Sequence, residues 1–505
     1  MTRICTLLTA VSAATLIAAD AQAGTLWMGT LTGAQEVPPV AVPFTGTGFL
    51  ILNTAETSAV ITVTHNVPAA IVVNGHVHRG VVGVNGPVIF GFPSSPGAPA
   101  GVSPVGPLTW AIPTAEVANL KAQGLYFNIH SQPNPGGVIR GQIVRALLAP
   151  SATNASQLAV ANALDVSAGF STELDQLLMA QAVGTAAGRS QALEELSGRT
   201  IYAQGRQAVE TMVDFQETIF GHTDDVTRRP AAGIGLFAAA GETFGKRDAE
   251  VGQSGSKISR TTFMAGVDLA SGEDLTGGLA IAYATGKDKF RGGVGETEVE
   301  TTSVQAFVSA GQGVVFTGVA GYGWSNLDTR RSLASLGRTA TSSQDGKVWS
   351  LAARVAAPMA FGGDSSLAPY AQIDMQRATI DAYSETGAGV AGLVAPKRKQ
   401  DSSAVEAGAT LTLPLAAAGG GLTARLRAGY RYRLDDGGDD FAVSLAGSPV
   451  AFLTSVQSQS RSAAHIGAAL SGNLATNLTA SASYRGLLSK DSNAHAVQAR
   501  VALAF

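Results

Sequence analysis

The segment from His495 to Phe505 alternates between two kinds of residue along its whole length. One set is apolar, and the residues between them are polar or small, which predicts an extended strand with two unlike faces. The apolar set is Val497, Ala499, Val501, Leu503 and Phe505. In lipid every backbone N–H and C=O group must be paired, so we expect this strand to close a β-barrel and leave no open edge.

A second segment, Leu422–Leu434, carries positive charge on one face of a predicted strand. Its even positions are apolar or aromatic and include Leu426, Tyr430 and Tyr432. A compact soluble core does not accommodate a row of four guanidinium groups, whereas the polar lumen of a membrane barrel does. The predicted lumenal residues are Arg425, Arg427, Arg431 and Arg433.

Comparable segments recur from about residue 232 onward and predict twelve strands. A spanning strand takes about 9–11 residues, so this region has room for twelve strands with their connections. Tight breaks such as 270–276 alternate with long ones such as 435–460, the pattern of periplasmic turns and outer loops. The predicted strands start near Ala232, Thr261, Thr276, Thr301, Val314, Val348, Leu367, Ser402, Leu422, Ser462, Asn477 and His495.

The first 23 residues have the layout of a secretory signal peptide. An apolar run follows Arg3, and small residues at positions 21 and 23 form a small-x-small cleavage motif before Gly24. We therefore expect export through the Sec translocon. The one cysteine of the sequence, Cys5, lies in this segment, so neither disulfides nor thiolate metal sites are expected in the exported chain.

Composition narrows the class of protein further. Charged residues make up 14% of the chain, the net charge is −3, and no basic block suited to nucleic acid is present. No apolar stretch after the signal is long enough for a transmembrane helix. The C-terminal half does not alternate helices with buried strands, as a soluble α/β enzyme would. A mainly β protein is predicted.

Between about residues 148 and 231 the apolar residues recur at the spacing of a helix instead of that of a strand. Val209, Met212, Phe215 and Ile219 recur at helical spacing, and the alanine-rich stretch 181–191 favours a helix. Because this segment lies directly before the barrel strands, we expect a helical linker that passes through the lumen.

The order of these parts resembles the translocator of autotransporters, the type V secretion proteins. The resemblance rests on Asn162–Asp165, the run Ala192–Gly198 with Tyr202 after it, the barrel segments of 232–505 and the final Phe505. It implies a twelve-stranded barrel in outer-membrane lipid, a helix in its pore and an N-terminal passenger exposed on the cell surface. It also implies that the barrel-assembly machinery reads a C-terminal signal formed by Val501, Leu503 and Phe505.

Residues 24–147 form the expected passenger, a small antiparallel β-sandwich of short apolar strands separated by turn signals. Its motifs resemble the CHRD domain, named after chordin, and follow that family's order. The family implies a secreted or surface protein without a defined catalytic activity. The matching runs are Leu31–Pro39, Gly75–Gly80, Asn85–Val88, Tyr126–His130 and Pro135–Gln142.

Four of the seven histidines lie in this passenger segment. His76 and His78 are two residues apart and therefore share one face of a strand, and His130 stands near the end of another. Three converging imidazoles would suit copper(II) or zinc(II). The His-x-His strand, the later histidine and the Gly-Gly turn are similar to the layout of copper–zinc superoxide dismutases, without a recognisable zinc arrangement. Structural hydrogen bonding and catalysis are the other interpretations.

A polar cluster of Glu36, Asn128 and Arg140 is expected beside these histidines, with Glu36 as a partner for the Arg140 charge. No nucleophile motif or carboxylate pair stands out, so an enzyme is not predicted. The main hypothesis is a displayed module that binds extracellular protein or polysaccharide without a cofactor. A copper- or zinc-binding or redox passenger is the alternative, and a porin-like channel with a plug domain is the third.

Overall fold

The computed structural model describes residues 24–94, 98–226, 233–249, 254–271, 274–415, 421–435, 440–455 and 460–505. The expected signal peptide and Ala232 lie outside these ranges. The described residues form two compact units, which are treated separately. One unit takes in the chain up to Ala146 and Val166–Met179, and the other takes in Leu147–Asp165 and Ala180–Phe505. Among the helices that the structure describes, none has both the length and the apolar character to cross a bilayer.

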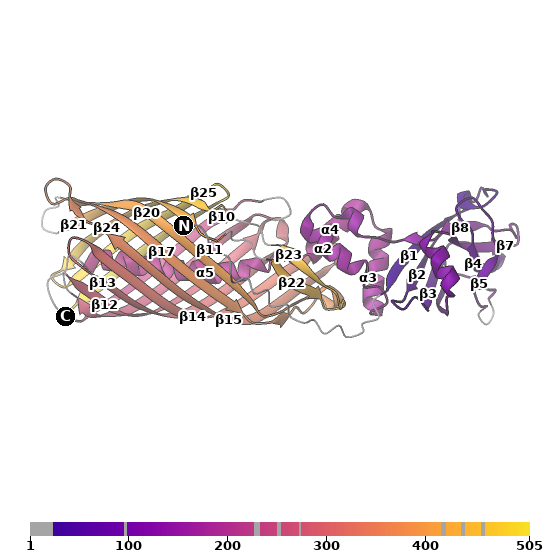
Figure 1. Ribbon diagram of the computed structural model, residues 1–505, viewed down its shortest axis with the longest axis horizontal. Helices are drawn as coiled ribbons and strands as arrows, with labels where there is room; N and C mark the ends of the chain where they lie inside the picture. The colour runs from indigo at the N-terminus through magenta and orange to yellow at the C-terminus, as the bar shows by residue number, and fades with distance from the viewer. Residues whose placement is uncertain are drawn as a thin grey trace, which may run out of the picture. The chain divides into compact units, whose positions relative to one another are not determined.

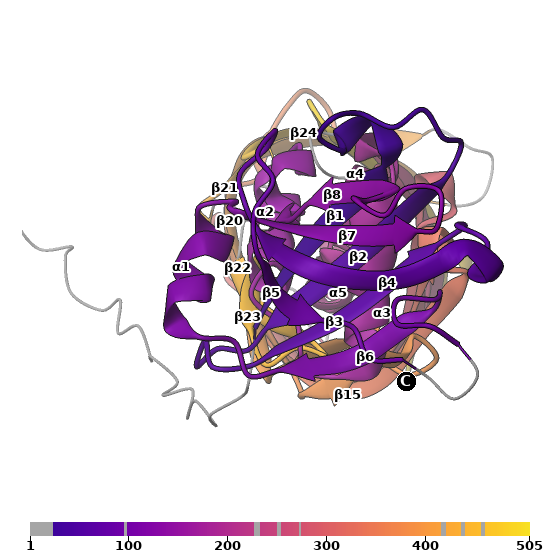
Figure 2. The same ribbon diagram turned by 90° about the vertical axis from the view of Figure 1, so that its right-hand side faces the viewer.

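The N-terminal unit is built on one antiparallel sheet, which confirms the predicted β fold of this segment (Figure 2). The strand order is β5-β4-β7-β8-β1-β2-β3-β6, and β9 pairs with β1. The strands are β1 (Thr25–Thr32), β2 (Thr45–Leu52), β3 (Ala59–His65), β4 (Val72–Arg79), β5 (Val88–Gly91), β6 (Val105–Trp110), β7 (Leu125–Ser131), β8 (Ile139–Gln142) and β9 (Val144–Arg145).

The sheet curls over a single apolar core. Phe127 of β7 lies against Gly48 of β2, although β8 and β1 separate these strands in the sheet. A Cβ atom at position 48 would come within 2.5 Å of the Phe127 ring, so this close approach needs a glycine. Helix α1 (Thr114–Lys121) adds Val117 and Leu120 to the core. Because Phe127 points into the core, the residues that alternate with it along β7 form the opposite face of the sheet.

In the C-terminal unit twelve long strands close into an antiparallel barrel, which confirms the predicted number (Figure 1). The last strand pairs with the first from Gly235 opposite Ala504 to Arg247 opposite Ser492. A two-residue strand, β16 (Met359–Ala360), adds to the same sheet. The twelve are β10 (Gly235–Arg247), β11 (Ser256–Ser271), β12 (Leu275–Phe290), β13 (Gly295–Ala310), β14 (Val315–Leu333), β15 (Arg338–Ala356), β17 (Ser366–Ile380), β20 (Arg398–Leu415), β21 (Leu422–Arg433), β24 (Ser462–Ala475), β25 (Leu478–Ser489) and β26 (Ser492–Ala504).

Alternate residues of each barrel strand face the lumen and the outside, as the period of two predicts. On β21 Leu426 is 49% exposed, whereas Arg425 beside it is 9% exposed. On β26 Val501 is likewise exposed and Arg500 is buried. The apolar face therefore points outward and the arginine face inward, which reverses the usual arrangement of a soluble protein.

Several strands begin earlier than the sequence suggests, and β13 and β15 differ most. The predicted starts at Thr301 and Val348 are wrong, because β13 begins at Gly295 and β15 at Arg338. The missed residues are mostly polar on both faces, so they carry no alternation of apolar and polar side chains. The ladder of hydrogen bonds nevertheless continues through them, as in the pairing of Thr297 with Thr329.

Helices precede the barrel, as predicted for this segment. They are α2 (Ala155–Leu164), α3 (Thr172–Val183), α4 (Ala186–Leu196) and α5 (Tyr202–Val226). Asn154 caps α2 by accepting a hydrogen bond from the Gln157 backbone N–H at 2.9 Å. Helix α5 lies inside the barrel (Figure 1), and its residues Met212, Phe215 and Ile219 are fully buried in a core shared with Phe237 and Phe307 of the wall.

Candidate functional site

Helix α5 enters the barrel at the end that carries its largest connections. The ring of Tyr202, at the start of α5, packs against Phe290 at the end of β12, with centroids 6.0 Å apart. The connections that follow β17 and β21 leave from this same end. They hold a small sheet of β18 (Tyr383–Ser384), β19 (Leu393–Ala395), β22 (Asp440–Leu445) and β23 (Ala451–Ser455). The chain before α5 therefore leaves the lumen on the side of the long connections.

Acidic residues along α5 pair with arginines of the barrel wall over the length of the helix. At the far end Asp225 pairs with Arg425 and Arg500, while Asp224 pairs with Arg354. Asp225 and the guanidinium groups are buried, whereas Asp224 is 40% exposed. A buried charge needs a charged and hydrogen-bonded partner. The remaining pairs are Glu210 with Arg247 and Arg260, Asp214 with Arg260 and Arg485, and Glu217 with Arg427.

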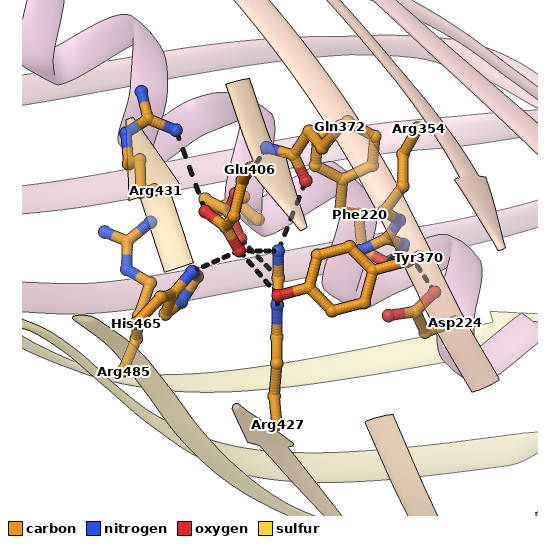
Figure 3. Close-up of polar contacts among 12 residues, drawn as sticks. Phe220, Asp224, Arg354, Tyr370, Gln372, Glu406, Arg427, Arg431, His465 and Arg485 are labelled. Carbon is orange, nitrogen blue, oxygen red and sulfur yellow. Dashed lines mark hydrogen bonds and ion pairs between the residues drawn. The ribbon is translucent and has the colours of Figure 1, made fainter. Parts of the chain in front are cut away.

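Arg427 lies at the centre of this network (Figure 3). Its guanidinium donates to Glu217 of α5 at 2.9 Å and to Glu406 of β20 at 2.8 Å, and its Nε donates to the Tyr370 hydroxyl at 2.8 Å. His465 contacts the same Glu406 carboxylate, with Nδ1 2.7 Å from Oε1. The helix and four wall strands, β17, β20, β21 and β24, thus share one cluster of hydrogen bonds.

The four arginines predicted to face the lumen have different partners. Arg425 and Arg427 bind acids of α5, whereas Arg431 binds Asp374 of β17 through two bonds of 2.7 Å. Arg433, at the end of β21, pairs with Asp435 at 2.7 Å. The sequence reasoning missed the helix acids, although Glu210, Asp214, Glu217 and Asp224 recur at helical spacing and carry that signal.

Two cavities lie between α5 and the wall. They measure about 120 and 150 Å³ and are lined by α5 and by wall strands from β20 to β26 and β10 to β11. Both are lined by Asp214, Glu217, His465 and Arg485. Cavities of this size hold a few water molecules among charged groups.

In the N-terminal unit, the polar face of the sheet gathers the residues singled out in the sequence. His76 lies opposite Asn128 across β4 and β7, and Asn128 lies opposite Arg140 across β7 and β8. Because alternate residues share a face, His78 and His130 join them. The sheet register therefore brings together side chains from three separate runs of sequence.

The three histidines form a tight cluster. Their ring centroids lie 5.1 to 5.8 Å apart, and one ring nitrogen from each lies within 4.8 Å of the other two. Nδ1 of His76 is 3.3 Å from Nε2 of His130. Burial lowers the pKa of all three rings, and the neighbouring histidines help to lower the pKa of His76 to about 4. The cluster is therefore uncharged at neutral pH.

Backbone carbonyls fix two of these rings. Nδ1 of His78 donates to the Gly86 carbonyl at 3.0 Å, and Nδ1 of His130 donates to the Pro135 carbonyl at 2.9 Å. A carbonyl oxygen can only accept, so the proton of each neutral ring lies on Nδ1 and the lone pair on Nε2. The fourth passenger histidine, His65, lies on β3 outside the cluster, and its Nε2 is 2.8 Å from the Gly101 carbonyl.

Glu36, Asn128 and Arg140 form the neighbouring polar cluster. Arg140 is 1% exposed, donates to the Val81 carbonyl at 2.9 Å and lies over the Tyr126 ring at 3.6 Å. Burial raises the pKa of Glu36 to about 7, against the opposing effects of the Arg140 charge and a hydrogen bond with Asn128. Arg140 is thus held by a carbonyl and an aromatic ring, with the Glu36 carboxyl nearby.

Family comparisons agree with this division of the chain. The model of the autotransporter β-domain matches residues 236–485, and that of the CHRD domain matches residues 29–143. No curated protein sequence matches the chain.

Solved structures with a similar fold include autotransporter barrels. The translocator domain of NalP from Neisseria meningitidis is 16% identical, with 59% of this chain and 98% of that chain covered and a TM-score of 0.47. The β-domain of BrkA from Bordetella is 16% identical, with 54% and 100% covered and a TM-score of 0.41. On the family matches, the chain combines a CHRD domain with a barrel that belongs to the autotransporter family of outer-membrane β-domains.

Proposed function

We propose that the barrel exports the CHRD domain and displays it on the cell surface. The observation that carries this proposal is the direction of α5, whose N-terminal end meets the side of the barrel with the long connections. In outer-membrane barrels the longer loops are extracellular and the short turns are periplasmic. A domain placed before α5 would therefore lie outside the cell.

The buried ion pairs support a helix that stays in the lumen after export. Glu217 and Asp225 are anchored to Arg427, Arg425 and Arg500 of the wall. Pulling the helix out would separate each of these charge pairs. The same packing fills the lumen with side chains of α5 and of the wall, such as Phe215 and Phe307, so we expect the intact protein to have a lower conductance than a porin-like channel.

Cysteine labelling of intact cells tests the display. Cys5 is the one native cysteine and lies in the expected signal peptide, so an engineered cysteine becomes the labelling site. Val82→Cys in the CHRD domain, where Val82 is 76% exposed, should react with a membrane-impermeant maleimide on intact cells. Arg291→Cys, after β12 on the long-connection side, is the positive control. Asp274→Cys, in the opposite turn, should react only after the outer membrane is opened, and the same behaviour by Val82→Cys would overturn the proposal.

For the displayed domain we propose a binding role, without turnover, toward an extracellular protein or polysaccharide. Support comes from the loop after β4, where Val81, Val82 and Val84 are each more than half exposed. Exposed apolar side chains grouped on one loop are common at interaction sites. Cells that carry Val82→Ser and Val84→Ser should adhere less to matrix proteins or polysaccharides than cells that carry Val60→Ser on β3. Equal adhesion would remove the loop from the binding role.

A further inference from the structure

We propose that the CHRD domain binds one divalent transition-metal ion through Nδ1 of His76 and Nε2 of His78 and His130, with copper(II) preferred to zinc(II). This site goes beyond display, since neither the barrel nor α5 contributes a ligand. One nitrogen from each of the three rings lies within 4.8 Å of the other two.

The carbonyl hydrogen bonds of His78 and His130 leave their Nε2 atoms without a proton. Since Nδ1 of His78 and of His130 each donate to a backbone carbonyl, both Nε2 atoms carry lone pairs. Nε2 of His78 is buried and has no hydrogen-bond partner among the described residues. A buried acceptor without a partner is unfavourable, and a metal ion would satisfy it. Carbonyl contacts to the second ring nitrogen are also the usual outer support of metal-binding histidines.

The spacing of the nitrogens is close to what one ion requires. Two imidazole nitrogens bound at about 2.0–2.1 Å lie about 2.9 Å apart on a tetragonal copper(II) ion and about 3.3 Å apart on a tetrahedral ion. Nδ1 of His76 is 3.3 Å from Nε2 of His130, so copper(II) needs a small closing movement of these two rings. His78 completes the set with a movement of its ring by roughly 1 Å or more, within the 4.8 Å limit. Without an ion, the His76 ring must donate its Nδ1 proton to His130, and with an ion that proton moves to Nε2.

The donor set indicates the kind of metal. Imidazole ligands suit zinc, copper and nickel rather than magnesium or calcium, which prefer oxygen. At one nitrogen site copper(II) binds more tightly than zinc(II). His76 is only partly buried, so its side of the cluster is open and a fourth ligand could come from solvent.

Copper titration of the full-length protein, extracted in detergent without a histidine tag and stripped of metal by a chelator, tests the proposal. We expect one copper(II) per chain and an electron paramagnetic resonance spectrum with nitrogen hyperfine coupling. Loss of an outer-shell partner costs about 10–100-fold in affinity, so His76→Ala, which removes a ligand, should weaken binding by more than about 100-fold. Protease resistance of the CHRD domain checks that each variant is folded.

His65→Ala is the matched control, because His65 lies in the same domain and outside the cluster. If folded His76→Ala and His65→Ala bind copper equally, the site is wrong. If neither His130→Ala nor His76→Ala changes the spectrum, the ligand set is wrong. Displacement of copper by an equal concentration of zinc would overturn the metal preference.

Discussion

Arg427 of β21 donates to Glu217 of α5, with Nη1 and Oε2 2.9 Å apart, and at the same time to Glu406 of β20 at 2.8 Å. One guanidinium thus ties the helix in the lumen to the wall. Both carboxylates are at most 10% exposed, so neither can turn to bulk water if the arginine is lost. Separating Glu217 from Arg427 would leave buried charges unpaired. This energetic penalty holds the helix in the lumen as much as the attraction between the two charges does.

Glu217→Ala should loosen the plug. Breaking a buried ion pair by removing one partner costs about 3–5 kcal/mol, because the other charge is left unpaired. We expect a lower urea midpoint for the barrel and more frequent open-channel events in planar bilayers than for the wild type. Arg377→Ala is the matched control, since Arg377 pairs with Asp401 on the outside at 41% and 54% exposure and such pairs contribute about 0–1 kcal/mol. Equal effects of the two substitutions would contradict a special role for the lumenal pair.

Gly205→Val should impair the seating of α5 against β20. A Cβ atom at position 205 would lie 2.7 Å from Cβ of Gln400, and Ile380 is also close. Overpacking of this kind costs about 1–3 kcal/mol. The measurement is the free energy of unfolding in urea, and Gly188→Val on α4, where Cβ would meet only the Thr185 hydroxyl at 3.2 Å, shows the effect of losing a helical glycine elsewhere. If Gly205→Val is as stable as Gly188→Val, the wall strands move to make room for the added side chain and the prediction is wrong.

Leu426→Arg should destabilise the barrel in lipid, because Leu426 is 49% exposed on the outer face in the middle of β21. An arginine on the lipid face costs about 2–4 kcal/mol at the midplane and about 0–1 kcal/mol near the interface. Leu434→Arg, just after the end of the same strand, is the control. Each variant is folded into vesicles and its free energy of unfolding is measured by urea titration. We expect a clearly lower value for Leu426→Arg than for Leu434→Arg. The reverse order would place the bilayer elsewhere on the barrel.

Glu36 should make the CHRD domain less stable as the pH rises through about 7. Burial raises the pKa of this carboxyl from 4.5 to about 7 in the folded domain. Between these two pKa values the folded state holds a proton that the unfolded state releases, so the stabilisation is complete below pH 4.5 and is lost progressively up to about pH 7. Protease resistance of the metal-free domain should fall between pH 4.5 and about pH 7 and then level off. Glu36→Gln, which stays neutral, should flatten this dependence, and an unchanged profile would contradict the assignment.

Much of the barrel could be predicted from the sequence because lipid and lumen impose opposite chemistry on alternate residues. Leu426 beside Arg427 and Val501 beside Arg500 show this alternation directly. Where a strand extends through polar residues, as β15 does from Arg338, both faces are polar and the period is lost. The small sheet of β18, β19, β22 and β23 was not predicted, because strands of two to six residues are too short to show a period.

The sites were predictable only in part. The spacing of His76 and His78 places them on one face of a strand, but His130 comes close only through the register of β4 with β7. Pairing between segments more than fifty residues apart leaves no local pattern. Likewise the arginines of β21 were visible as a row. Their partner Glu217 belongs to a helix whose place in the lumen was expected from its position before the barrel, not from its own residues.

The pairing of β26 with β10 has a consequence for the order of events in the life of the chain. These strands come from opposite ends of the barrel sequence, and every residue from Gly235 to Arg247 finds its partner between Ser492 and Ala504. The ring of strands cannot close until the last of them has been synthesised. Until then β10 keeps an unpaired edge, which is a site for mispairing and aggregation. The strands of the barrel must therefore stay unpaired, and separated from other polypeptides, until the barrel can close in the membrane.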